Sequence, residues 1–178
     1  SFSQDKGLNE VGVRVLFIDF NNTLWLGHEG GGITRYTGNK FEKISLTDTI
    51  LKSNITSINQ DQDGQLWITS ESDGIVVIRN PQDPAQFLEY EHFLTGKNLW
   101  HQVFGSLLTR NGDLYFITNV GIRKYNKTTH SFEIFSPKGL STYFSIATMY
   151  EDSRGYLWFG TYNGGLTMMN PRDMSFRY

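Results

Sequence analysis

The chain has 178 residues, and its 16 Lys and Arg against 18 Asp and Glu give a formal net charge of −2. No block of like charge occurs, so the electrostatic footprint of a nucleic-acid-binding protein is missing. The absence of cysteine excludes disulfides, zinc–thiolate sites and thiol nucleophiles. No apolar run approaches the ~18 residues that would cross a bilayer.

Short β-strands are the predicted elements, because apolar residues alternate with polar ones and then meet Asp, Asn or Gly turns. The first four strands are predicted at 13–18, 24–28, 33–36 and 41–44. Glycine-bearing turns follow the first and second strands, and glycine supplies the positive φ that tight hairpins require. No helical stretch with capping residues is evident.

This pattern of strands and turns occurs four times. The copies read "NNTLWLGHEGGG", "DGQLWITSESDG", "NGDLYFITNVG" and "RGYLWFGTYNGG". Their central rings, which we call the anchors, are Trp25, Trp67, Tyr115 and Trp158, separated by 42, 48 and 43 positions. An acid stands six residues before three anchors, at Asp19, Asp61 and Asp152, and Thr109 takes that place in the third copy.

A period in the low forties with four strands per copy predicts an all-β chain of β-propeller blades. One such sheet cannot bury both faces alone, so it stacks on a neighbour, and the anchors are expected to pack between blades. We predict four four-stranded antiparallel blades of about 42–48 residues. Residues 1–12 are expected to close a preceding blade, and the four blades are predicted at 13–54, 55–102, 103–145 and 146–178.

"DQDGQLWITSESDGIVVI" and "EDSRGYLWFGTYNGGLTMMN" resemble the two-component regulator propeller repeat, D-x-x-G-x-L-W-[IF]-G-T-x-x-G-G-L. Two copies depart from that pattern, one through Tyr115 and the other through Thr69 and Ser70 in place of Gly-Thr. The resemblance implies a fragment of a larger, seven-bladed propeller from a bacterial sensor. Such a sensor would hold this part in the periplasm, anchored through a membrane helix to a histidine kinase outside the segment.

Ligand-binding residues are expected on one rim of the propeller, where the turns after second strands and the loops between blades meet. The predicted rim residues are Trp100, His101, Tyr143, Phe144, His28, Glu29, Glu71, Asp73, Tyr162 and Asn163. Rings beside carboxylates and amides suit a carbohydrate ligand. An equal alternative for Trp100 and Phe144 is that they cap the core beneath a long loop.

Metal and cofactor sites are not expected. The turn at 61–64 lacks the further acids that a calcium loop needs. The four histidines share no ligand spacing, and no catalytic constellation stands out.

The leading hypothesis is a non-catalytic, ligand-sensing segment of a two-component receptor that recognises an oligosaccharide or glycan fragment. One alternative is a propeller-type lyase or glycoside-active enzyme, for which His28 and His101 are the candidate groups. Another is a protein-interaction scaffold. Because open blade faces are apolar, we also expect self-association or contact with further blades, with a closed four-bladed ring as the weaker option.

Overall fold

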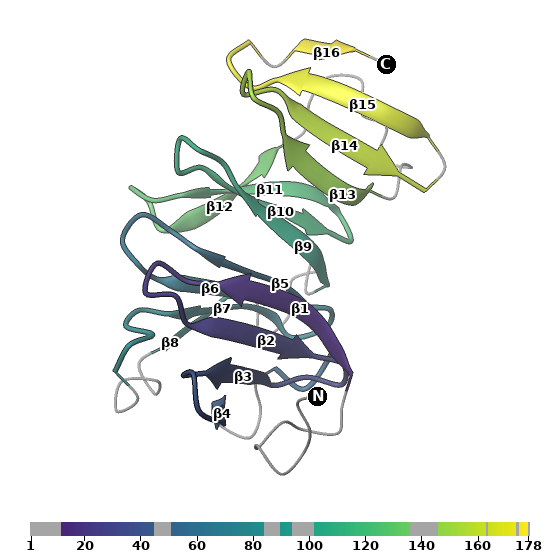
Figure 1. The fold of residues 1–178 in the computed structure, drawn as a ribbon. Helices are drawn as coiled ribbons and strands as arrows, with labels where there is room; N and C mark the ends of the chain where they lie inside the picture. The colour runs from purple at the N-terminus through teal and green to yellow at the C-terminus, as the bar shows by residue number, and fades with distance from the viewer. Residues whose placement is uncertain are drawn as a thin grey trace. The chain divides into compact units, whose positions relative to one another are not determined.

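The computed structural model describes residues 12–44, 51–83, 90–93, 102–135, 146–162, 164–173 and 175–177. These residues form sixteen strands in four antiparallel sheets of four strands each (Figure 1). In every sheet the strands lie side by side in chain order, so each sheet is a simple meander. Within the described ranges, no helix has the length and hydropathy to span a membrane.

Each sheet is one blade. Blade 1 comprises β1 (Val13–Ile18), β2 (Leu24–His28), β3 (Ile33–Tyr36) and β4 (Phe41–Ile44), the four ranges predicted from the sequence. Blade 2 comprises β5 (Ile55–Gln60), β6 (Leu66–Ser70), β7 (Gly74–Ile78) and β8 (Tyr90–Phe93). Blade 3 comprises β9 (Val103–Leu108), β10 (Leu114–Thr118), β11 (Gly121–Asn126) and β12 (Ser131–Phe135). Blade 4 comprises β13 (Ile146–Glu151), β14 (Leu157–Thr161), β15 (Gly165–Asn170) and β16 (Ser175–Arg177).

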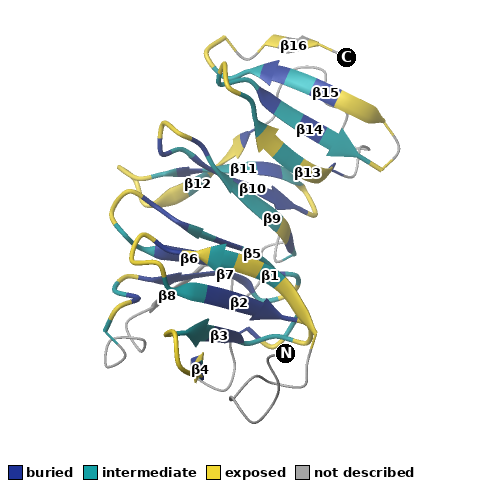
Figure 2. Ribbon diagram, viewed as in Figure 1, coloured by how far each residue is buried: buried dark blue, intermediate teal, exposed yellow. Residues whose placement is uncertain are grey.

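The chain divides into two compact units, Ser1–Val103 and Phe104–Tyr178. The first contains blades 1 and 2, and the second contains blade 4 and all of blade 3 except Val103. Each unit has its own core, and Figure 2 colours the buried residues dark blue.

The core of the first unit lies between blades 1 and 2. Blade 1 contributes the anchor Trp25, which is fully buried, together with Ile33 and Ile44. Blade 2 contributes side chains from its first three strands: Ile55, Ile58, Leu66, Ile68, Val76 and Ile78. One sheet therefore buries its face only by stacking on the next.

The core of the second unit repeats this arrangement. The anchor Tyr115 of blade 3 is 2% exposed and shares a cluster with residues of both blades. The blade 3 members are Tyr115, Ile117, Ile122 and Phe135, and the blade 4 members are Ile146, Leu157, Phe159 and Met169. Of the other two anchors, Trp67 is 2% exposed and Trp158 is half-buried.

Gly27 marks a close approach of the two sheets in the first unit. A Cβ at Gly27 would lie 2.5 Å from Cγ2 of Ile55, so no side chain fits between β2 and β5 without movement. Gly105 in β9 is different, because a Cβ there would meet only Cδ1 of Ile117 at 3.8 Å.

We therefore expect Gly27→Ala to destabilise the protein by about 1–3 kcal/mol through overpacking. Gly105→Ala should be neutral or slightly stabilising, because it only removes the backbone entropy of a strand glycine. Urea unfolding of both variants measures this difference. Ile55→Ala should relieve part of the cost of Gly27→Ala in the double mutant, because it removes Cγ2 but keeps the Cβ that would lie at 2.8 Å. A cost with no relief at all would contradict the proposed clash.

Candidate functional site

A buried carboxylate organises the turn between the first two strands of blade 1. Oδ1 of Asp19 accepts hydrogen bonds from the backbone N–H groups of Asn21 and Thr23, both at 2.9 Å. Oδ2 accepts a hydrogen bond from Nε1 of Trp25 at 2.9 Å. Asp19 is only 3% exposed, and these donors replace the water that its charge loses on burial.

Two other blades repeat the same geometry. In blade 2, Asp61 accepts from the backbone N–H groups of Asp63 and Gln65 at 3.0 Å and from Nε1 of Trp67 at 2.8 Å. In blade 4, Asp152 accepts from the backbone of Arg154 and Tyr156 and from Nε1 of Trp158 at 3.1 Å. The six-residue spacing from acid to indole is therefore a hydrogen-bonded unit that fixes turn and anchor together.

Blade 3 changes both members of the unit at once. The Tyr115 ring has no N–H to donate, and the acid is replaced by Thr109, whose hydroxyl accepts from the backbone N–H of Asp113 at 3.0 Å. The same hydroxyl donates to the carbonyl of Asp113, so the turn closes without a buried charge. Burial raises the pKa of Tyr115, and Nζ of Lys124 lies 5.5 Å from the ring centroid.

A second repeated contact, which we call the latch, is a hydrogen bond that joins the two sheets of each unit. Oε1 of Gln60, just before the turn acid of blade 2, accepts from the backbone N–H of Phe20 in blade 1 at 2.7 Å. Oε2 of Glu151, at the same position in blade 4, accepts from the backbone N–H of Arg110 in blade 3 at 2.8 Å. Each latch joins residues forty or more positions apart.

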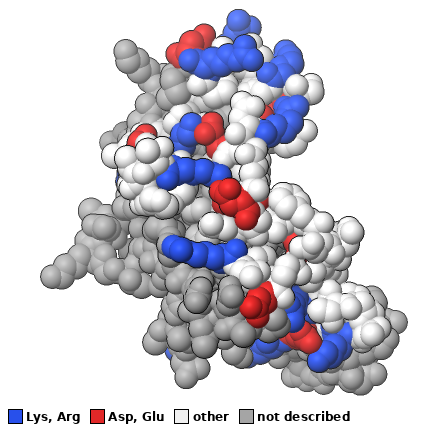
Figure 3. All heavy atoms as spheres, turned by 90° about the vertical axis from the view of Figure 1, so that its left-hand side faces the viewer, with Lys and Arg blue, Asp and Glu red and all other residues white. Residues whose placement is uncertain are grey.

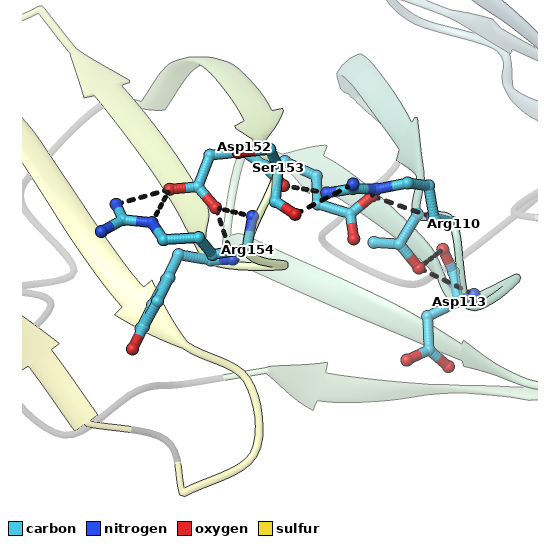
Figure 4. A network of polar contacts seen from close by, with 8 residues as sticks. Arg110, Asp113, Asp152, Ser153 and Arg154 are labelled. Atoms are coloured by element: carbon cyan, nitrogen blue, oxygen red, sulfur yellow. Dashed lines mark hydrogen bonds and ion pairs between the residues drawn. The ribbon is translucent and has the colours of Figure 1, made fainter.

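The latch of the second unit is extended by charge, as Figure 4 shows. The guanidinium of Arg110 forms an ion pair with Glu151 at 3.4 Å and donates to the backbone carbonyls of Asp152 and Ser153. Burial acts to raise the pKa of Asp152, but hydrogen bonds from Arg154, Trp158 and the turn backbone outweigh it and hold the pKa well below its ordinary value.

Figure 3 shows cations and acids interspersed on the face in view.

On the first unit, a polar network joins the turns after β2 and β6 to the residues that connect blades 1 and 2. Oδ1 of Asn54 accepts from the backbone N–H of Gly30 at 2.8 Å, while its Nδ2 donates to Glu71 at 2.7 Å. Oδ2 of Asp73 accepts from the backbone N–H of Ser53 at 2.7 Å and from Oγ of Ser70 at 3.0 Å. The structure thus places the predicted residues Glu71 and Asp73 in one network.

Sequence reasoning missed Ser53, Asn54 and Ser70 as members of this network. The sequence does place residues 51–54 directly before the first strand of blade 2, but its pattern does not show which turn they contact.

The remaining predicted rim residues are placed differently. His28 is 1% exposed and bonds Oγ1 of Thr34 at 2.8 Å, so its ring lies inside the sheet and not at a rim surface. Glu29 is exposed, and its backbone N–H bonds the carbonyl of Gly12 at 2.8 Å. Tyr162, in the second unit, is 77% exposed. The residues that lie outside the described ranges are Trp100, His101, Tyr143, Phe144 and Asn163.

Metal binding finds no support where the structure describes the chain. Among the described residues, no group of three or more His, Asp or Glu side chains could hold a metal ion.

Four-stranded meanders that stack through buried rings at a regular repeat are the blades of a β-propeller, as the repeat predicted. Residues 49–72 and 139–163 match the family described as two component regulator propeller. The resemblance drawn from the repeats is therefore confirmed in these two segments. None of the curated protein sequences matches the chain.

Solved structures support the fold. The extracellular domain of a proposed hybrid two-component system from B. thetaiotaomicron is 23% identical with a TM-score of 0.73, covering 93% of this chain and 24% of that one. Virginiamycin B lyase from Staphylococcus aureus is 15% identical with a TM-score of 0.72, covering 96% of this chain and 56% of that one. PorZ, of the type-IX secretion system of Porphyromonas gingivalis, is 14% identical with a TM-score of 0.71, covering 93% and 27%. The chain thus spans about a quarter of the first and third proteins and about half of the lyase.

Asp61→Asn should lower the free energy of unfolding by about 1–3 kcal/mol, because the amide cannot accept from both the turn and Nε1 of Trp67. Asp63→Asn, in the same turn but exposed, should change it by less than about 0.5 kcal/mol. Equal losses in the two variants, measured by urea unfolding, would show that the buried acceptor has no special part.

The lowered pKa of Asp152 predicts that the stability of the protein depends on pH. Because the folded state lowers its pKa, its contribution is present above the ordinary carboxyl pKa of about 3.9 and is lost as the pH falls through the folded-state value. The stability difference between the native protein and Asp152→Asn should therefore shrink as the pH falls below about 4. Thermal unfolding across that range checks it, and a difference that stays constant would exclude linkage through Asp152.

Proposed function

We propose that this chain is an extracytoplasmic, ligand-sensing propeller segment of a two-component receptor and recognises an oligosaccharide or glycan fragment. The proposal is carried by the two segments that match the two component regulator propeller family. The fold it shares with the extracellular domain of a proposed hybrid two-component system agrees with that assignment. The segment itself would bind without catalysis, and a histidine kinase elsewhere in the receptor would supply the output.

The rim of the first unit offers oriented acceptors. Glu71 and Asp73 are held by Asn54, Ser53 and Ser70, so their carboxylates are positioned before any ligand arrives. Preorganised groups lose little side-chain entropy on binding. Sugar hydroxyls are suitable donors to such oxygens.

The second unit offers an aromatic surface of its own at Tyr162. Its ring is 77% exposed in the turn after β14, where a large apolar surface has no packing role within the described residues. Aromatic side chains with a polar tip serve well at binding surfaces because one end contacts apolar groups and the other hydrogen-bonds. A sugar ring can stack on such a face.

The enzyme alternative gains no specific support. Likeness to virginiamycin B lyase at 15% identity concerns the fold. The candidate group His28 is 1% exposed and bonded to Thr34, so it could not meet a substrate without opening the sheet.

A thermal-shift screen of the 178-residue protein against a panel of oligosaccharides tests the proposal. A bound glycan should raise the midpoint of unfolding, and calorimetry should then show that Tyr162→Ala weakens binding about tenfold, the loss of one aromatic contact of about 1.4 kcal/mol.

Tyr156→Ala is the matched control, because Tyr156 belongs to the turn at the other end of β14 and contacts Arg154. Its affinity should equal that of the native protein. A panel without any stabilising glycan, or equal affinity in the Tyr162 variant, would count against the proposed ligand class.

A further inference from the structure

The turns after the second strands are held in two different ways. In the second unit, the hydroxyls of Thr118 and Thr161 each donate to the carbonyl of the glycine that ends their own turn, at 2.6 and 3.2 Å. The same position, three residues after the anchor, is occupied by His28 in blade 1 and Ser70 in blade 2. In the first unit, both turns bond to residues 51–54, which we call the strap.

The turn of blade 1 receives the strap on three glycines. Gly30, Gly31 and Gly32 have φ values of 71°, 98° and 85°. The backbone N–H of Gly32 donates to the carbonyl of Leu51 at 2.8 Å. A Cβ on Gly31 would collide with that carbonyl and would lie 2.7 Å from the backbone carbonyl carbon of Lys52. The strap therefore fits against this turn because Gly31 has no side chain.

The strap is seated in a strained conformation. Leu51 has a φ of 56°, in the left-handed region that residues with side chains rarely adopt. Its side chain is 4% exposed and belongs to the core between blades 1 and 2. Strain of this kind persists only where the surrounding structure holds it. Burial of Leu51 thus offsets the strain, and a strap whose leucine left the core would relax to another conformation.

The same strap holds the turn of blade 2. The carbonyl of Asn54 accepts from the backbone N–H of Glu71 at 2.9 Å, and Oγ of Ser53 accepts from the backbone N–H of Ser72 at 2.8 Å. Bonds from Nδ2 of Asn54 to Glu71 and from the backbone N–H of Ser53 to Asp73 fix the two carboxylates. The positions of carboxylates on blade 2 therefore depend on a segment that is seated on blade 1.

We propose that the strap is a conformational device with a docked and a released state. When it is docked, Leu51 lies in the core, the backbone lies against Gly31, and Glu71 and Asp73 are held in place. When it is released, both carboxylates lose the bonds that position them. Regulation of ligand binding by this device rests on the proposed function, whereas docking is a property of the protein without ligand.

Amide hydrogen exchange of the 178-residue protein tests the device without any glycan. In the native protein, the amides of Gly32 and Glu71 should show similar protection, lower than that of Ile68 in β6, because one release event frees both. Gly31→Ala should then speed exchange at Glu71 and Ser72 about tenfold, although both lie in the other blade, because its Cβ displaces the strap.

Gly32→Ala is the matched control. Gly32 also has a positive φ, but its Cβ would meet nothing within 4 Å, so the substitution strains the same turn without touching the strap. Exchange at Glu71 and Ser72 should stay at the native rates.

Three results would each overturn the proposal: unequal protection of Gly32 and Glu71 in the native protein, native rates in Gly31→Ala, or equal acceleration in Gly32→Ala. The first of these needs no variant to fold. Because no ligand takes part, a glycan screen without any hit leaves these measurements unaffected, and the two proposals can fail separately.

Discussion

The hydrogen bond from a tryptophan Nε1 to a buried carboxylate is the interaction on which each complete repeat depends. A carboxylate with an exposed fraction of a few per cent must be paired, and Asp19 and Asp61 each receive two backbone donors and one indole donor. The bond is specific in both directions. It fixes the hairpin between the first two strands, and it orients the ring that fills the space before the next sheet. A change in the turn is therefore also a change in the packing.

The latches extend this local constraint to pairs of sheets. Gln60 and Glu151 stand directly before the turn acids, and each reaches back to the backbone of the preceding blade's turn. The acid that bonds the anchor and the residue that bonds the turn of the neighbouring blade are thus adjacent in the chain. Stacking by apolar contact is non-directional, whereas a hydrogen bond to one backbone N–H sets the register of one sheet on the other. Within each unit, the ring supplies burial and the latch supplies alignment.

The sequence predicted the strands of blade 1 residue by residue, because alternation and positive-φ turns are local signals. It also showed that acid and anchor share a spacing and that Thr109 and Tyr115 change together, without showing the bond that links them. Contacts between blades were out of reach, since the bond from Phe20 to Gln60 spans forty residues and depends on sheet register. His28 illustrates another limit. Its place at the end of β2 predicted a rim position, but its ring points onto the sheet face, where it meets Thr34.

In the function proposed above, the network at the rim of the first unit would couple ligand binding to blade packing. Asn54 bonds both Gly30 of blade 1 and Glu71 of blade 2, and Ser53 bonds Asp73, so the residues between the blades hold both turns. A ligand that draws on Glu71 or Asp73 must compete with these bonds or reinforce them. In either case its affinity differs between arrangements of the two turns, which is the condition for a ligand to shift a conformational equilibrium. A sensor built from such sheets would need no separate transmission element, because its acceptors belong to the connection between one blade and the next.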